Sequence, residues 1–169
     1  MDGKSLRDCF TASFLKQEQC KAVTFLRNSE IESEISYLQL HQDSNRMAAT
    51  LQELGVSKAD RVILCIQKSL IFVIAHLALQ KIGAIAVPLN PGFKKSELDY
   101  LLHDADPKLI LTEPDKERLI AEIDSGLTTL MVDTQRSYQD IDFFRSAPEE
   151  YNRVEIEPDD TGLIIYTSG

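Results

Sequence analysis

From residue 61 onward, short and almost unbroken apolar runs alternate with stretches of helical length. Strands that are apolar at nearly every position are typical of parallel sheets, because they are covered on both faces. Their alternation with helices of about 10 residues predicts right-handed crossovers. We therefore predict an α/β fold with a mostly parallel, doubly wound sheet and helices on both faces. The expected strands are Arg61–Ile66, Ala84–Pro88, Leu109–Leu111 and Thr129–Val132, and the expected helices are Leu70–Ile82, Ser96–Asp104 and Asp115–Ile123.

Smaller elements are predicted ahead of this alternation. Two strand-like runs, 23–27 and 31–35, enclose the polar sequence Asn-Ser-Glu and predict a small β-hairpin. Ser36 and Gln39 then have the spacing of a helix capping box. A helix is expected over residues 37–55, where the final glycine suits the left-handed position that follows many helices.

The chain ends in an apolar run followed by a small hydroxyl-rich turn. Residues 136–160 are expected to form an acidic connector with a helix over 138–147, and Gly162–Tyr166 is expected to be a buried final strand. Thr167, Ser168 and Gly169 follow it. Small hydroxyls and a glycine can surround an anion closely, since Gly adds no Cβ and Thr and Ser add donors. Because ligands collect beyond the carboxyl ends of parallel strands, this turn is our candidate phosphate-binding loop.

The charge and the cysteines exclude several classes of protein. The 169-residue chain has a formal net charge of −9, which repels nucleic acids and anionic membrane surfaces, so we expect no nucleic-acid partner. Polar residues interrupt the longest apolar region, residues 70–89, and no membrane span is expected. Cys9, Cys20 and Cys65 lie far apart and form no disulfide or zinc pattern, and the N-terminus lacks the features of a signal peptide. A cytoplasmic location is therefore expected.

Three segments, taken in order, resemble the adenylate-forming superfamily of acyl-CoA synthetases, luciferases and peptide-synthetase adenylation domains. The first, residues 45–62, contains Leu-Gln-Glu-Leu-Gly-Val and Asp-Arg-Val. The second, residues 76–108, contains Val-Pro-Leu-Asn-Pro and Asp-Ala-Asp-Pro-Lys. The third, residues 159–169, begins with Asp-Asp-Thr and ends with Ile-Ile-Tyr-Thr-Ser-Gly. Their order and spacing match the superfamily over nearly the whole chain.

The resemblance implies a two-step ligase that uses ATP, Mg²⁺ and coenzyme A. A small-molecule carboxylate attacks the α-phosphorus of ATP to give an acyl-adenylate and pyrophosphate, and a thiol, usually that of coenzyme A, then takes the acyl group. The resemblance also implies that Thr167, Ser168 and Gly169 begin the loop that holds the pyrophosphate end of ATP. In this superfamily the adenine pocket, the acyl pocket, the metal-binding acid and the catalytic lysine all follow that loop.

Residues 1–169 are therefore expected to be the N-terminal subdomain of an acyl-CoA synthetase, cut within its phosphate loop and inactive alone. The remainder of the parent chain is expected to pack on this subdomain. Two positions depart from the superfamily: Ala59 stands where glycine is common before Asp-Arg-Val, and Gln39 stands where glutamate is common. The residues do not indicate which carboxylic acid is activated.

Two other classes of function stay open on the residues alone. One is a flavodoxin-like nucleotide-binding module, although its phosphate loop normally follows the first strand of the fold. The other is a non-catalytic α/β interaction domain. His76 is expected to pack within its helix rather than act as a base, and Lys94-Lys95 is expected to be a surface pair. The acidic connector is expected to be solvated rather than to bind a metal ion.

Overall fold

The computed structural model describes residues 5–167, apart from the side chains at positions 142 and 143. Its centre is a four-stranded sheet in the order β4-β3-β5-β6, and every pairing in it is parallel. The four strands predicted between residues 61 and 132 are confirmed within one residue at their ends. They are β3 (Arg61–Cys65), β4 (Ile85–Pro88), β5 (Leu109–Thr112) and β6 (Thr128–Met131).

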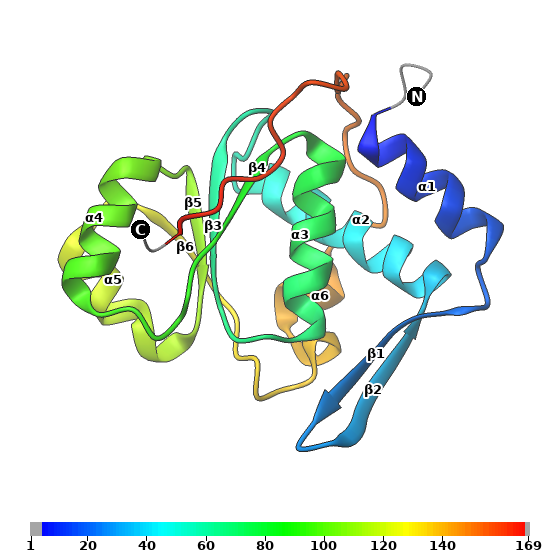
Figure 1. Ribbon diagram of the computed structural model, residues 1–169, viewed down its shortest axis with the longest axis horizontal. Coiled ribbons are helices and arrows are strands. Elements are labelled where there is room, and N and C mark those ends of the chain that lie inside the picture. Colours follow the sequence, from blue (N-terminus) through cyan, green and yellow to red (C-terminus); the bar gives the residue numbers. More distant parts are fainter. Residues whose placement is uncertain (1–4, 168–169) are drawn as a thin grey trace.

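Helices cover both faces of this sheet, as the doubly wound fold requires. Figure 1 shows α4 and α5 on one face and α1, α2, α3 and α6 on the other. The sheet is thus sandwiched between two separate hydrophobic clusters, with alternate side chains of β3 and β5 entering each. The helices are α1 (Leu6–Lys16), α2 (Tyr37–Glu53), α3 (Leu70–Ile82), α4 (Lys95–Ala105), α5 (Glu117–Ile123) and α6 (Asp142–Ser146).

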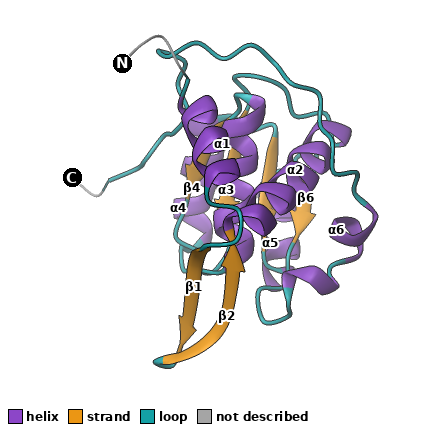
Figure 2. Ribbon diagram, turned by 90° about the vertical axis from the view of Figure 1, so that its right-hand side faces the viewer, coloured by secondary structure: helices purple, strands orange, loops and turns teal. Residues whose placement is uncertain are grey.

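The predicted hairpin is present and projects from the body of the molecule (Figure 2). It pairs β1 (Lys21–Arg27) with β2 (Glu30–Ser36) in antiparallel register. Asn28 and Ser29 form its two-residue turn with positive φ angles of 52° and 67°. Two consecutive left-handed residues match the right-handed twist of the flanking strands, which explains the tight turn. Glu30, expected in the turn, belongs to β2.

Two local expectations need adjustment, and one helix was not expected. Helix α1 was not predicted, although Ser5 caps it by accepting a hydrogen bond from the Asp8 N–H at 3.3 Å. Ser36 caps α2 as expected, but the Gln39 side chain donates to Asp43 rather than back to the cap, so the capping box is only half formed. The predicted helices over 115–123 and 138–147 each begin with a 3₁₀ turn, Pro114–Lys116 and Tyr138–Asp140.

The last segment reaches the sheet but is not the buried strand that the sequence predicted. Leu163 forms one parallel bridge with Ala86 of β4, so the segment lies at the edge of the sheet beyond β4. Leu163 is 42% exposed and Ile165 is 62% exposed. The apolar pattern was misleading because, within residues 5–167, no further element covers this side of the edge segment.

Candidate functional site

Because the four strands are parallel, their carboxyl ends all lie on one side of the sheet, here called its carboxyl edge. This carboxyl edge is distinct from the lateral edges, which are formed by β4 and β6. The last segment also runs parallel to β4, so the chain leaves the sheet at its carboxyl edge. Ligands of open α/β sheets bind there. Thr167, the first residue of the predicted phosphate loop, is exposed at this edge, whereas Ser168 and Gly169 lie outside the described residues.

The segment before Thr167 is attached to β4 and to α3 at its beginning. The Gly162 carbonyl accepts a hydrogen bond from the Ala86 N–H at 3.1 Å, and the Ile164 N–H donates to the Ala86 carbonyl at 3.0 Å. The Gln80 side chain of α3 donates from Nε2 to the same Gly162 carbonyl at 2.7 Å. Gly162 is therefore held from the sheet and from a helix at once.

The same segment is attached to α4 at its end. The Tyr166 hydroxyl donates a hydrogen bond to Oδ2 of Asp104 at 2.6 Å. Burial of the ring and this bond to a carboxylate raise the pKa of Tyr166 to about 12. A phenol is protonated at physiological pH even at its ordinary pKa of 10.0, so the Tyr166 hydroxyl is a proton donor immediately before Thr167. Asp104 and Gln80 both lie in the segment 76–108 that resembles the superfamily, but the sequence assigned no contact to either.

A carboxylate occupies the point where the strand order reverses, between β3 and β5. Glu113 accepts hydrogen bonds there from the Gln67 N–H at 3.0 Å and from the Thr134 hydroxyl at 2.6 Å. Its other oxygen accepts from the Thr134 N–H at 3.2 Å. A flavodoxin-like module binds its phosphate at such a reversal. Because the chain's own negative charge holds these donors, the structure disfavours the flavodoxin-like alternative.

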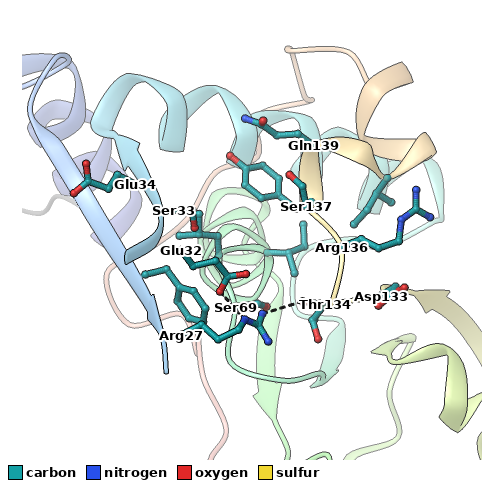
Figure 3. Close-up of a pocket in the computed structure, with 15 residues that line it drawn as sticks. Arg27, Glu32, Ser33, Glu34, Ser69, Asp133, Thr134, Arg136, Ser137 and Gln139 are labelled. Carbon is teal, nitrogen blue, oxygen red and sulfur yellow. Dashed lines mark hydrogen bonds and ion pairs between the residues drawn. The ribbon is translucent and has the colours of Figure 1, made fainter. Parts of the chain in front are cut away.

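A hollow of about 250 Å³ opens between the hairpin, the start of α3 and the segment after β6. Figure 3 shows Arg27 between Glu32 and Thr134; its guanidinium donates to the Glu32 carboxylate at 2.8 Å and to the Thr134 carbonyl at 3.3 Å. Glu34 and Asp133 add negative charge to the walls. This mixed lining does not suit a phosphate. Sequence patterns missed the hollow because Arg27 and Thr134 are 107 residues apart.

The remaining candidates behave as ordinary structural residues. Burial lowers the pKa of His76, and the side chain lines a second hollow of about 280 Å³ beside Gln80 and Leu163. Lys95 forms an ion pair with Glu122 at 3.1 Å, as expected of a surface residue. Within the described part of the chain, no three His, Cys, Asp or Glu side chains are grouped so as to hold a metal ion.

One buried cation was not anticipated. Lys81 of α3 is 3% exposed and faces α2, where its ammonium group donates to the Asn45 side-chain oxygen at 2.6 Å and to the His41 carbonyl at 2.9 Å. Burial, with a smaller contribution from the nearby Arg153, lowers the pKa of Lys81 to about 7. This lysine joins two helices that cover the same face of the sheet.

Comparisons with known proteins point to one family. The profile described as "AMP-binding enzyme" matches residues 12–169. Surfactin synthase subunit 3 from Bacillus subtilis (strain 168) is 33% identical over 135 residues, which cover 80% of this chain and 10% of that protein. ATP-bound MatB from Rhodopseudomonas palustris has a TM-score of 0.80 at 28% identity, covering 95% of this chain and 32% of that chain. The N-terminal domain of FACL13 from Mycobacterium tuberculosis has a TM-score of 0.81 at 25% identity, covering 98% and 42%.

The chain spans less than half the length of each of these relatives, from 10% of the synthase subunit to 42% of the FACL13 domain. The similarity to the solved structures confirms the predicted fold class, a parallel sheet flanked by helices and preceded by a hairpin. Among the described helices, none combines the length and the apolar character that a membrane-spanning helix needs.

Proposed function

Because this chain belongs to the AMP-binding enzyme family, the adenylate-forming superfamily that its motifs resemble, we propose that it is the N-terminal part of an acid–CoA ligase. The ligase activates a carboxylic acid with ATP to an acyl-adenylate and transfers the acyl group to coenzyme A. The observation that carries this proposal is the position of Thr167 at the carboxyl edge of the sheet, on a segment attached to β4, α3 and α4. ATP-bound MatB shares this fold, which supports ATP as the cofactor.

In this proposal the residues of the loop bind the triphosphate through neutral donors. The hydroxyls of Thr167 and Ser168 donate to phosphate oxygens, and Gly169 lets the backbone approach closely. Neutral donors suit a chain with a net charge of −9, which offers no general basic field. Mg²⁺ supplies further neutralisation of the triphosphate when bound. A carboxylate is a poor electrophile and must be activated. Its activation is feasible because the enzyme holds the triphosphate while charge develops on the departing pyrophosphate.

The rest of the protein is proposed to cover the edge segment. Leu163 and Ile165 are large apolar side chains that are 42% and 62% exposed there. The matched relatives are longer than this chain, which supports additional chain at this edge.

The cysteines Cys9, Cys20 and Cys65 are all free, which fits a reducing compartment and supports the expected cytoplasmic location.

A second candidate is an amino-acid-activating adenylation domain that loads a carrier-protein thiol. It is favoured by the 33% identity to surfactin synthase subunit 3. Both candidates share the adenylation step and differ in the acceptor thiol. Thioester formation with free coenzyme A supports the first, and acyl transfer only to a carrier-protein pantetheine supports the second.

The test is carboxylate-dependent exchange of pyrophosphate into ATP by a full-length protein that contains this chain. Thr167→Ala and Ser168→Ala should each slow exchange by about 30- to 1000-fold, the usual effect of losing a hydrogen bond that acts on developing charge. Gly169→Val should slow it further, since its side chain excludes the phosphate. Thr128→Ala is the matched control, because Thr128 is an exposed threonine on β6 at the opposite edge of the sheet. Wild-type exchange in all three loop variants would refute the loop assignment.

A further inference from the structure

The segment that leads into Thr167 is paired with the sheet at a single residue. Gly162 and Ile164 share Ala86 as their backbone partner, and no further strand pairing follows within residues 5–167. Groups that hold a reacting ligand need placement to within about 0.5 Å. A lone bridge several residues upstream does not fix Thr167 that well, so side-chain contacts must complete its placement.

We propose that Asp104 positions Thr167 by holding Tyr166, with Gln80 as the second anchor of the same segment. This inference rests on the proposed function, because it concerns the placement of the phosphate loop. Asp104 lies in the last turn of α4 and Gln80 lies in α3, on opposite faces of the sheet (Figure 1). The segment is therefore held at Gly162 from one face and at Tyr166 from the other.

The first anchor requires the glycine that the sequence provides. A Cβ at position 162 would lie 2.6 Å from Oε1 of Gln80, closer than real Cβ contacts come. The absence of a side chain at Gly162 therefore lets the Gln80 amide approach and donate to the Gly162 carbonyl at 2.7 Å. This contact fixes where the segment begins along the edge of β4.

The second anchor acts next to the loop itself. The Tyr166 ring packs against the hydrophobic cluster under α4, and its hydroxyl reaches Asp104 at 2.6 Å, the length typical of a hydroxyl that donates to a carboxylate. Tyr166 and Thr167 share a peptide unit, so a shift of the ring moves the loop. A carboxylate near a triphosphate site disfavours binding by its charge alone. We therefore infer that Asp104 acts through its hydrogen bond with Tyr166 rather than through its negative charge.

Three variants of the full-length protein separate these two effects in the pyrophosphate-exchange assay. Asp104→Ala should lower kcat/KM for ATP by about 10- to 100-fold, the effect of a misplacement near 1 Å. Asp104→Asn removes the charge but keeps an oxygen that accepts from the phenol, so it should keep near-wild-type exchange. Asp99→Ala is the matched control, because Asp99 is an exposed acid on the same helix that pairs with His103 instead.

Tyr166→Phe tests the same contact from its other side. It removes one oxygen and should match Asp104→Ala, and the double variant should be no slower than either single one. If Asp104→Ala fails to fold, Tyr166→Phe still decides the question, since the ring keeps its packing. Wild-type exchange in Tyr166→Phe, or an equal loss in Asp104→Asn and Asp104→Ala, would overturn the proposal.

A readout without catalysis separates this inference from the proposed function. In the 169-residue chain, ¹³C NMR of the tyrosine rings follows the titration of Tyr166, assigned with Tyr166→Phe. Asp104→Ala should bring the pKa of Tyr166 down from about 12, and Asp99→Ala should leave it unchanged. If this pKa shift occurs but none of the carboxylic acids tested supports pyrophosphate exchange by the wild-type protein, the proposed function fails and the contact stands. If exchange occurs and the shift does not, the positioning role is refuted.

Discussion

Replacing Ala59 with glycine should stabilise the protein. Ala59 lies in the turn between α2 and β3 and has a φ of +68°, a left-handed conformation that an alanine side chain disfavours. The turn cannot relax easily, because the Ala59 N–H donates to the Gly83 carbonyl at 2.8 Å and the Ser57 N–H donates to the Asp60 carboxylate at 2.8 Å. Glycine adopts this conformation without strain.

Two opposing effects set the size of the gain. The left-handed conformation costs alanine about 1–2 kcal/mol, which glycine avoids. Glycine also gives the unfolded chain more freedom, which costs about 0.4–1 kcal/mol. Ala59→Gly should therefore raise the free energy of unfolding by about 0.5–1 kcal/mol, and Tm by about 1–4 °C for a chain of this size.

Urea unfolding followed by circular dichroism measures this change. Ala121→Gly is the matched control. It makes the same chemical change at an exposed residue of α5, where the backbone is a right-handed helix. It should lower the free energy of unfolding by about 0.5–1 kcal/mol. Opposite signs for the two variants support the strain at Ala59. A loss of stability in Ala59→Gly equal to that in Ala121→Gly would refute the reasoning.

Two further predictions concern the buried lysine and the isolated chain. Because burial lowers the pKa of Lys81 to about 7 while the unfolded chain keeps the ordinary value of 10.5, the unfolded state holds more protons between these pH values. The free energy of unfolding, measured by urea titration, should therefore rise from pH 7 to 10. This rise should be smaller in Lys81→Met and unchanged in Lys68→Met, the control at an exposed lysine. An equal rise in the wild type and both variants would contradict the prediction. The 169-residue chain, which contains only the start of the proposed loop, should show no submillimolar binding of ATP with Mg²⁺ in calorimetry, and tighter binding would refute the inactive-fragment hypothesis.

Local periodicity was sufficient to predict most of the fold. The runs that became β3, β4 and β5 are apolar at consecutive positions because helices cover both of their faces, and this pattern is visible without any structure. Helix α1 was missed because only Phe14 is buried in it, which leaves little apolar periodicity to detect. Its one clear signal was local, the pair Ser5 and Asp8 at capping-box spacing.

The edge of the sheet could not be predicted in the same way. Residues 162–166 have the apolar character of a buried strand, but whether such a strand is central or at an edge depends on what lies beyond it. Leu163 and Ile165 are exposed for this reason. The contacts of the segment also lay beyond sequence reasoning, since Gln80 and Gly162 are separated by 82 residues and Asp104 and Tyr166 by 62. Such pairs follow from topology and carry no local signal.

Glu113 explains why the candidate loop lies at the edge of the sheet rather than at the reversal of strand order. Parallel α/β sheets offer their best ligand crevice at that reversal, where loops diverge and backbone N–H groups are free. Here the N–H groups of Gln67 and Thr134 are already bonded to a carboxylate that lies between β3 and β5. A phosphate would have to displace a charge of its own sign from these donors. The open carboxyl end beside β4, where Thr167 is exposed and its segment is anchored from both faces, therefore remains the better place for an anionic ligand.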